Sequence, residues 1–150
     1  MHIWTTRGLL TFALAAAAAA APAAEYLQPV NPQRAYSAGV VTDGGRIVWL
    51  AGMGGVSGAD GKPISDFAGQ TRQTFRNIEA TLKQAGGTLG DIVTMTVMIR
   101  NQSDGDEFVR LRGEIFKEHF PASMLITAKD FANPSLLVEV QSVAVVGERN

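Results

Sequence analysis

The sequence predicts an α+β domain in which two helices cover one face of a mostly antiparallel sheet. Its apolar segments follow one another in the order strand, strand, helix, strand, helix, strand, strand. Two helices on the same side cover only one sheet face. The other face still carries Val, Leu and Ile side chains, so we expect it to be buried against something outside the protomer.

The chain has 150 residues, of which 46% are hydrophobic and 18% are charged, which suits one compact domain. An Ala-rich apolar run over residues 9–21 follows a short lead, and Ala21-Pro22-Ala23 supplies a small-x-small processing pattern. We therefore interpret residues 1–23 as a signal peptide and expect a periplasmic or secreted protein without stable membrane association. An uncleaved anchor is the alternative, but the run is shorter than the roughly 20 residues that span a bilayer.

Composition argues against several classes of function. Loss of Arg7 with the signal peptide leaves 12 of the 13 basic side chains beside 14 acidic ones, a net charge of −2 without a basic cluster. Nucleic acid is therefore not an expected partner. The chain has no Cys, and His119 is the only imidazole beyond residue 23. A metal site built on Cys or His is therefore not expected.

The first structured segments are predicted to be an arm and a hairpin. Residues 24–34 contain two prolines, which disfavour a helix, and we expect an extended N-terminal arm. Residues 36–42 and 46–51 are apolar or β-branched, and the Asp-Gly-Gly between them predicts a hairpin. The Gly-rich segment 52–61 lacks the third glycine of a dinucleotide fingerprint. We interpret it as a flexible loop whose backbone approaches a ligand.

Two amphipathic helices and one strand follow. Ser65 or Asp66 is expected to cap a helix that ends near Ala85, before two glycines. The strand over residues 91–100 alternates in polarity. Its predicted apolar face consists of Val93, Met95, Val97 and Ile99.

The second helix is predicted to start at a capping pair of Asp104 and Glu107 and to stop before Pro121. Its spacing of three and four residues indicates a buried side. The expected buried residues are Phe108, Leu111 and Ile115, and the expected solvated charges are Arg110, Arg112, Glu114, Lys117 and Glu118.

Two further strands are expected within residues 120–146, separated by a turn at residues 132–135. Glu139 lies in the second of them, between Val138 and Val140, on the face that also carries Gln141. A carboxylate in so apolar a strand belongs either to the wet face of an antiparallel sheet or to a functional site.

Several stretches resemble the RidA/YjgF family. They are Tyr36-Ser37-Ala38-Gly39-Val40, Gly90-Asp91-Ile92-Val93-Thr94-Met95-Thr96-Val97, Phe120-Pro121-Ala122-Ser123 and Leu137-Val138-Glu139-Val140-Gln141-Ser142-Val143-Ala144-Val145. The resemblance covers about Ala35 to Val146 and marks residues 35–150 as a RidA-like domain. It implies a chorismate-mutase-like, two-layer fold assembled as a homotrimer, with small-molecule clefts between neighbouring subunits. Active members hydrolyse enamine and imine intermediates to ketoacids and ammonia without a metal or an organic cofactor.

The resemblance also implies roles for single residues. Glu139 matches a glutamate of the last strand that is thought to assist the water chemistry, and it is our expected catalytic residue. Tyr36 matches a cleft tyrosine and Gly52 a glycine beside the ligand. Ser123 stands where the family places the arginine that holds the substrate carboxylate, and Ala51 stands where the family usually places a serine.

Serine supplies neither the charge nor the two parallel donors of that arginine. Arg112, near the position of a helix asparagine in the family, and Lys129 are the candidates to replace it, although both read by default as surface charges. A deaminase of altered substrate range therefore competes with a non-catalytic homotrimer that binds a neutral or less acidic ligand. Ribonuclease, a third activity associated with the family, is disfavoured by the net charge of −2.

Overall fold

The computed structural model describes residues 24–28 and 32–147, so the expected signal peptide over residues 1–23 lies outside the described residues. The main elements are β1 (Ala24–Tyr26), β2 (Val40–Thr42), β3 (Arg46–Trp49), α1 (Phe67–Gln84), β4 (Ile92–Ile99), α2 (Gly105–Phe116), β5 (Ala122–Thr127) and β6 (Val138–Val146). Single 3-10 turns lie at Pro32–Arg34, Leu89–Asp91 and Gln102–Asp104. From β2 onward the predicted order of strands and helices is confirmed.

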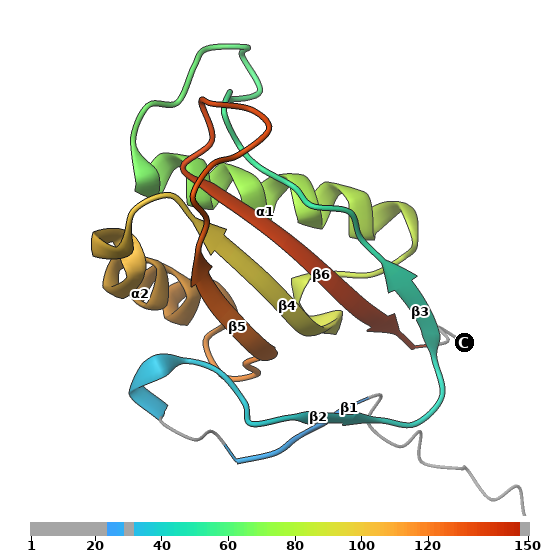
Figure 1. Cartoon of the computed structure of the whole chain (residues 1–150). Helices are drawn as coiled ribbons and strands as arrows, with labels where there is room; N and C mark the ends of the chain where they lie inside the picture. Colours follow the sequence, from blue (N-terminus) through green and yellow to red (C-terminus); the bar gives the residue numbers. More distant parts are fainter. Residues whose placement is uncertain (1–23, 29–31, 148–150) are drawn as a thin grey trace, which may run out of the picture.

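The central sheet has the strand order β3-β6-β4-β5. Its β3–β6 and β6–β4 pairs are antiparallel and its β4–β5 pair is parallel. Both helices lie on the same side of this sheet, behind it in Figure 1, and the near side is left uncovered by either helix. The predicted α+β architecture, with two helices on one face of a mostly antiparallel sheet, is therefore confirmed.

The core lies between the sheet and the helices. Its most buried members are Phe75, Ile78, Leu82, Ile92, Met95, Val97, Ile99, Phe108, Leu111, Val138, Val140 and Ala144. Alternate residues of β4 and β6 contribute to it, as the period of two requires. One detail of the prediction was wrong, because the β4–β6 register shifts between Ile92 and Thr94. This bulge buries Ile92 and leaves Val93 only half-buried.

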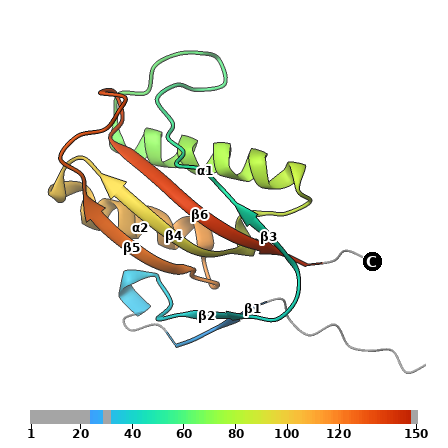
Figure 2. The same ribbon diagram turned by 45° about the vertical axis from the view of Figure 1, so that its right-hand side comes forward.

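The predicted first hairpin is also wrong. Strands β2 and β3 both form, and Gly44 and Gly45 between them adopt φ of 74° and 80°. However, β2 pairs with β1 in a separate two-stranded sheet, whereas β3 pairs with β6. Both views show β1 and β2 beside the central sheet and not within it (Figure 2). The N-terminal arm is therefore the partner of β2, and β6 is the partner of β3.

That arm is more ordered than expected. Its first residues form β1, and it ends in the 3-10 turn Pro32–Arg34 where an extended segment was predicted. Proline fits the first position of a helical turn because its missing N–H has no partner there. The Tyr26 hydroxyl donates to the Gly90 carbonyl at 3.1 Å, and its ring stacks 5.2 Å from that of His119. Burial, reinforced by the charge of Asp91, raises the pKa of Tyr26.

The two helices start differently. Helix α1 begins as predicted, with the Asp66 carboxylate accepting from the Gly69 N–H at 2.6 Å. The predicted cap of α2 is wrong, since Asp104 makes no side-chain cap and accepts from Asn101 Nδ2 at 3.1 Å. A 3-10 turn leads directly into α2, so Asp104 already has helical backbone angles and cannot reach its own first turn.

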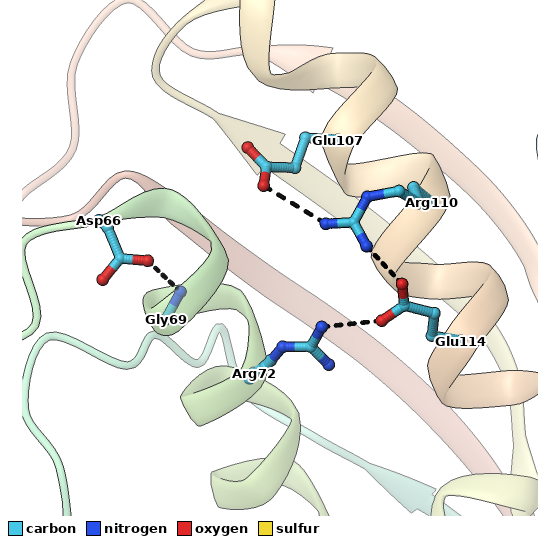
Figure 3. A network of polar contacts seen from close by, with 6 residues as sticks. All are labelled: Asp66, Gly69, Arg72, Glu107, Arg110 and Glu114. Atoms are coloured by element: carbon cyan, nitrogen blue, oxygen red, sulfur yellow. Dashed lines mark hydrogen bonds and ion pairs between the residues drawn. The ribbon is translucent and has the colours of Figure 1, made fainter.

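Ion pairs join the helices on their outer surface (Figure 3). Arg72 of α1 contacts Glu114 of α2 at 2.7 Å, and Glu114 also pairs with Arg110. Hydrogen bonds and the charges of these two arginines lower the pKa of the exposed Glu114. Neither helix in the described part of the chain is long and apolar enough to cross a membrane.

Candidate functional site

Glu139 lies on the sheet face opposite the helices and alternates along β6 with the buried Val138 and Val140. It pairs with Met98 of β4, and Met98 pairs with Ile126 of β5, so these three side chains form one row across the open face. The neighbouring row contains Gln141, Thr96 and Met124. Glu139 is half-buried, and both apolar and polar side chains lie in these two rows. The carboxylate is thus presented on a surface that neither helix covers.

Gly52 lies directly against this carboxylate. A Cβ atom added to Gly52 would lie 2.3 Å from Glu139 Oε1, far closer than atoms approach without displacement. The backbone here is fixed to β6, because Met53 and Val140 exchange two N–H···O bonds of 2.9 Å. The structure therefore brings together two of the residues predicted for the site, Glu139 and Gly52.

A second cluster forms at the β5 edge of the sheet, between β5 and α2. Arg112 extends from α2 and donates from Nη1 to Ser123 Oγ at 2.6 Å, and its Nη2 donates to the Arg34 carbonyl. The guanidinium lies 5.8 Å from the centre of the Tyr36 ring and 5.5 Å from that of Phe108. Tyr36, Ser123 and Arg112 are therefore also brought together, on the helix side of the sheet.

Arg112 corrects the prediction of a solvated charge, since only 2% of the residue is exposed. Burial, and then the nearby charge of Arg34, lower the pKa of Arg112 to about 10, while Tyr36 acts in the opposite direction. The guanidinium consequently remains protonated at neutral pH. No ion pair joins it to an acidic side chain within residues 24–28 and 32–147, and its Nε has no hydrogen-bond partner there.

The two clusters do not meet within one protomer. Ser123 pairs with Met95, whose side chain points into the core, whereas Glu139 is on the opposite face and on the other side of β4. Lys129, the other candidate for the missing arginine, is exposed beyond the end of β5. The positive charge nearest to the position of the missing arginine therefore belongs to the buried Arg112, which donates to Ser123.

Two surface hollows lie elsewhere. One, of about 630 Å³, is bordered by Arg34, Asp106 and the end of β5. The other, of about 530 Å³, lies between the 56–65 loop and the 133–137 loop. Neither is lined by Glu139, Gly52, Tyr36 or Ser123. Each cluster supplies part of a site, here called a half-site, and neither cluster lines one of these two hollows.

Two helices on one face of a four-stranded sheet, together with the Gly52–Glu139 contact, define a RidA-like protein. A family model described as Endoribonuclease L-PSP matches residues 26–146. The chain belongs to this family, which is the RidA/YjgF family.

Relatives and solved structures agree with this assignment. The chain is 28% identical over 123 residues to a 2-iminobutanoate/2-iminopropanoate deaminase of Dermatophagoides farinae, covering 79% of this chain and 89% of the relative. Its identity to the Escherichia coli protein of the same name is 29% over 106 residues, covering 69% and 82%. The structure of the Rid protein YyfB from Yersinia pestis superimposes with a TM-score of 0.74 at 23% identity, covering 83% of this chain and all of that one. This last similarity supports the fold.

Proposed function

We propose that this protein is a hydrolytic deaminase of small enamine or imine acids. The observation that carries the proposal is the placement of the Glu139 carboxylate against the Gly52 backbone, on a sheet face that neither helix covers. Relatives named 2-iminobutanoate/2-iminopropanoate deaminases support the choice of substrate class. A half-buried carboxylate held beside a fixed backbone segment is suited to accept a proton from a water molecule and to return it.

Imine hydrolysis requires a group that accepts a proton from water and later donates a proton to the leaving nitrogen. Glu139 orients a water molecule and takes one of its protons as the water oxygen bonds to the imine carbon. Glu139 returns this proton to nitrogen, which gives the tetrahedral carbinolamine. Glu139 then carries the proton of the carbinolamine hydroxyl to the same nitrogen, the C–N bond breaks, and the products are a ketoacid and ammonia. Glu139 serves first as base and then as acid, so the proton count closes without another reagent.

We propose that the site is completed by a homotrimer. The Gly52–Glu139 and Tyr36–Ser123–Arg112 clusters lie on different faces of one protomer, so a substrate cannot touch both unless a neighbouring subunit supplies one. The uncovered face also carries large exposed apolar side chains, including Trp49 and Met124. Packing this face against other copies would bury them and bring two half-sites together. We further propose that the mature protein is exported after cleavage at residue 23.

The test is release of ammonia or trapped semicarbazone from imino acids that an amino-acid oxidase generates in situ. Wild-type protein should accelerate hydrolysis of 2-imino acids, and Glu139→Gln should abolish the acceleration because the amide cannot accept the water proton. Glu118→Gln, the same change at an exposed residue, should leave the rate unchanged. Equal rates for wild type and Glu139→Gln would contradict the assignment.

A non-catalytic, ligand-binding homotrimer is the second candidate, favoured by Ser123 in the position of the substrate-binding arginine. It predicts no Glu139-dependent turnover of any imino acid, together with measurable binding of a small ligand. We do not propose ribonuclease activity, although the family description includes it, because the chain has no excess of positive charge to hold a phosphate backbone.

A further inference from the structure

The buried guanidinium of Arg112 has no counterion in the described part of the protein. Only 2% of the residue is exposed, and its hydrogen bonds go to a neutral hydroxyl and a neutral carbonyl. A buried ion is strongly unfavourable unless an opposite charge compensates it. The charge of Arg34 also acts on the guanidinium and repels it. Within residues 24–28 and 32–147, the guanidinium charge is therefore left without an acidic partner.

Ser123 connects this buried charge to the surface. A hydroxyl has one proton to donate and two lone pairs to accept with, and Ser123 Oγ already accepts from Arg112 at 2.6 Å. Its own proton is therefore free to point elsewhere, and the described residues offer it no hydrogen-bond acceptor. The side chain is half-buried, so one side of it faces outward at the edge of β5. The guanidinium polarises this hydroxyl and strengthens it as a donor.

We propose that Ser123 and Arg112 together form the anion-binding half of the site and make it selective for substrates that carry a carboxylate. The Ser123 hydroxyl donates to one carboxylate oxygen, while Arg112 behind it supplies the charge without touching the ligand. This inference rests on the proposed function for the identity of the ligand, a small 2-imino or 2-oxo monocarboxylic acid. It also predicts that the ligand of a non-catalytic homotrimer, the second candidate function, carries a carboxylate and is not neutral.

The arrangement also predicts how the anion is held. Each terminal nitrogen of Arg112 donates once within the protein, to Ser123 and to the Arg34 carbonyl, and only 2% of the residue is exposed, so the two-pronged grip of an exposed arginine is absent. Stacking against Tyr36 and Phe108 further fixes the guanidinium. A single hydrogen bond through Ser123 should therefore hold the carboxylate, and the Arg112 side chain should not move on binding.

The experiment compares a carboxylate with its neutral isostere. Binding of 2-oxobutanoate and of 2-oxobutanamide to protein produced from the full chain is measured by calorimetry, independently of turnover. We expect the wild type to bind the carboxylate at least tenfold more tightly than the amide. Ser123→Ala and Arg112→Met should each reduce this preference about tenfold, since each removes one charge-assisted hydrogen bond or its charge. Arg110→Met, on the exposed side of the same helix, should leave it unchanged.

The ratio between the two ligands distinguishes a binding role from a structural one. Damage to the fold would weaken both ligands alike, whereas loss of the anion contact should weaken the carboxylate alone. A preference that survives in Ser123→Ala would overturn the role of the hydroxyl, and one that survives in Arg112→Met would overturn the role of the charge. Arg112→Lys, which keeps the charge but not the planar donor, should retain part of the preference if the charge acts from behind the serine.

The same measurements separate this inference from the proposed function. Carboxylate preference that depends on Ser123 and Arg112, without Glu139-dependent turnover, would support the anion site and overturn the deaminase. Glu139-dependent turnover, with equal binding of acid and amide, would support the deaminase and overturn the anion site.

Discussion

At the scale of single residues, the site depends on a glycine as much as on a carboxylate. Gly52 contributes no side chain, and this absence allows Glu139 Oε1 to occupy the space where a Cβ would otherwise lie. The ladder bonds between Met53 and Val140 prevent the backbone from withdrawing. The position of the carboxylate is therefore set by the strand beside it, and a methyl group at residue 52 would force the carboxylate to move.

We predict that Gly52→Ala lowers the rate of imino-acid hydrolysis about 100-fold while changing stability little. Displacing a catalytic group by about an ångström can cost this much in rate, whereas the atom displaced belongs to a flexible side chain. The measurement is the hydrolysis rate together with the urea midpoint of unfolding. Gly90→Ala is the matched control, since its new Cβ would meet only Thr88 Oγ1 at 3.5 Å. An unaltered rate in Gly52→Ala would show that the carboxylate position is not critical.

The sequence could predict one half of the candidate site better than the other. Glu139 and Gly52 were predicted from their strand context and family match, and the structure places them in contact. The sequence pattern favours a solvated Arg112, because arginine is rarely buried. The available signal was its spacing, since residue 112 follows the buried Phe108 by four positions and therefore lies on the same helix face. The sequence could not predict that the 34–37 segment lies beside α2. There the Arg34 carbonyl accepts a hydrogen bond from the guanidinium, and the Tyr36 ring lies against it.

At the scale of secondary-structure elements, the two helix starts provide a paired test of capping. Asp66 accepts from the Gly69 N–H, whereas Asp104 bonds only to Asn101 on the surface. Asp66→Ala should lower the free energy of unfolding by about 1 kcal/mol, the usual contribution of an N-cap. Asp104→Ala should change it by less than about 0.5 kcal/mol, as for most surface substitutions. Urea unfolding measures both, and equal losses would mean that the Asp66 hydrogen bond does not stabilise α1.

The strands show why local patterns predict elements more reliably than their pairing. Asp43-Gly44-Gly45 correctly indicated a turn, and both glycines have positive φ. A turn does not determine the partners of its flanking strands, however, because β2 also has a free edge that β1 occupies in a three-residue ladder. Similarly, alternation in residues 91–100 predicted β4, but the bulge between Ile92 and Thr94 exchanged two residues between faces. Both outcomes depend on pairing between strands that are distant in the sequence, so neither can be predicted from a local segment.

At the scale of the whole molecule, the uncovered sheet face is the feature that one protomer does not explain. The helices bury the other face, yet Trp49 remains 75% exposed and Met124 52% exposed on separate strands of the sheet. Exposed apolar surface of this kind marks an interaction site. The sequence predicted such a face from apolar residues that two helices could not cover. The separation of the two half-sites gives an independent reason for this face to meet another copy of the chain.

The last prediction tests that assembly. Trp49→Glu places a charge where we expect apolar contact between subunits, and burying an unpaired carboxylate is strongly unfavourable. The variant should therefore elute as a folded monomer in size-exclusion chromatography with light scattering, while the wild type elutes as a trimer. Ala80→Glu, on the exposed side of α1, adds the same charge and should stay trimeric. Because each proposed site needs residues from two subunits, monomeric Trp49→Glu should also lose imino-acid hydrolysis. A monomer that keeps full activity would show that one protomer suffices for catalysis, and a trimeric variant would place the interface elsewhere.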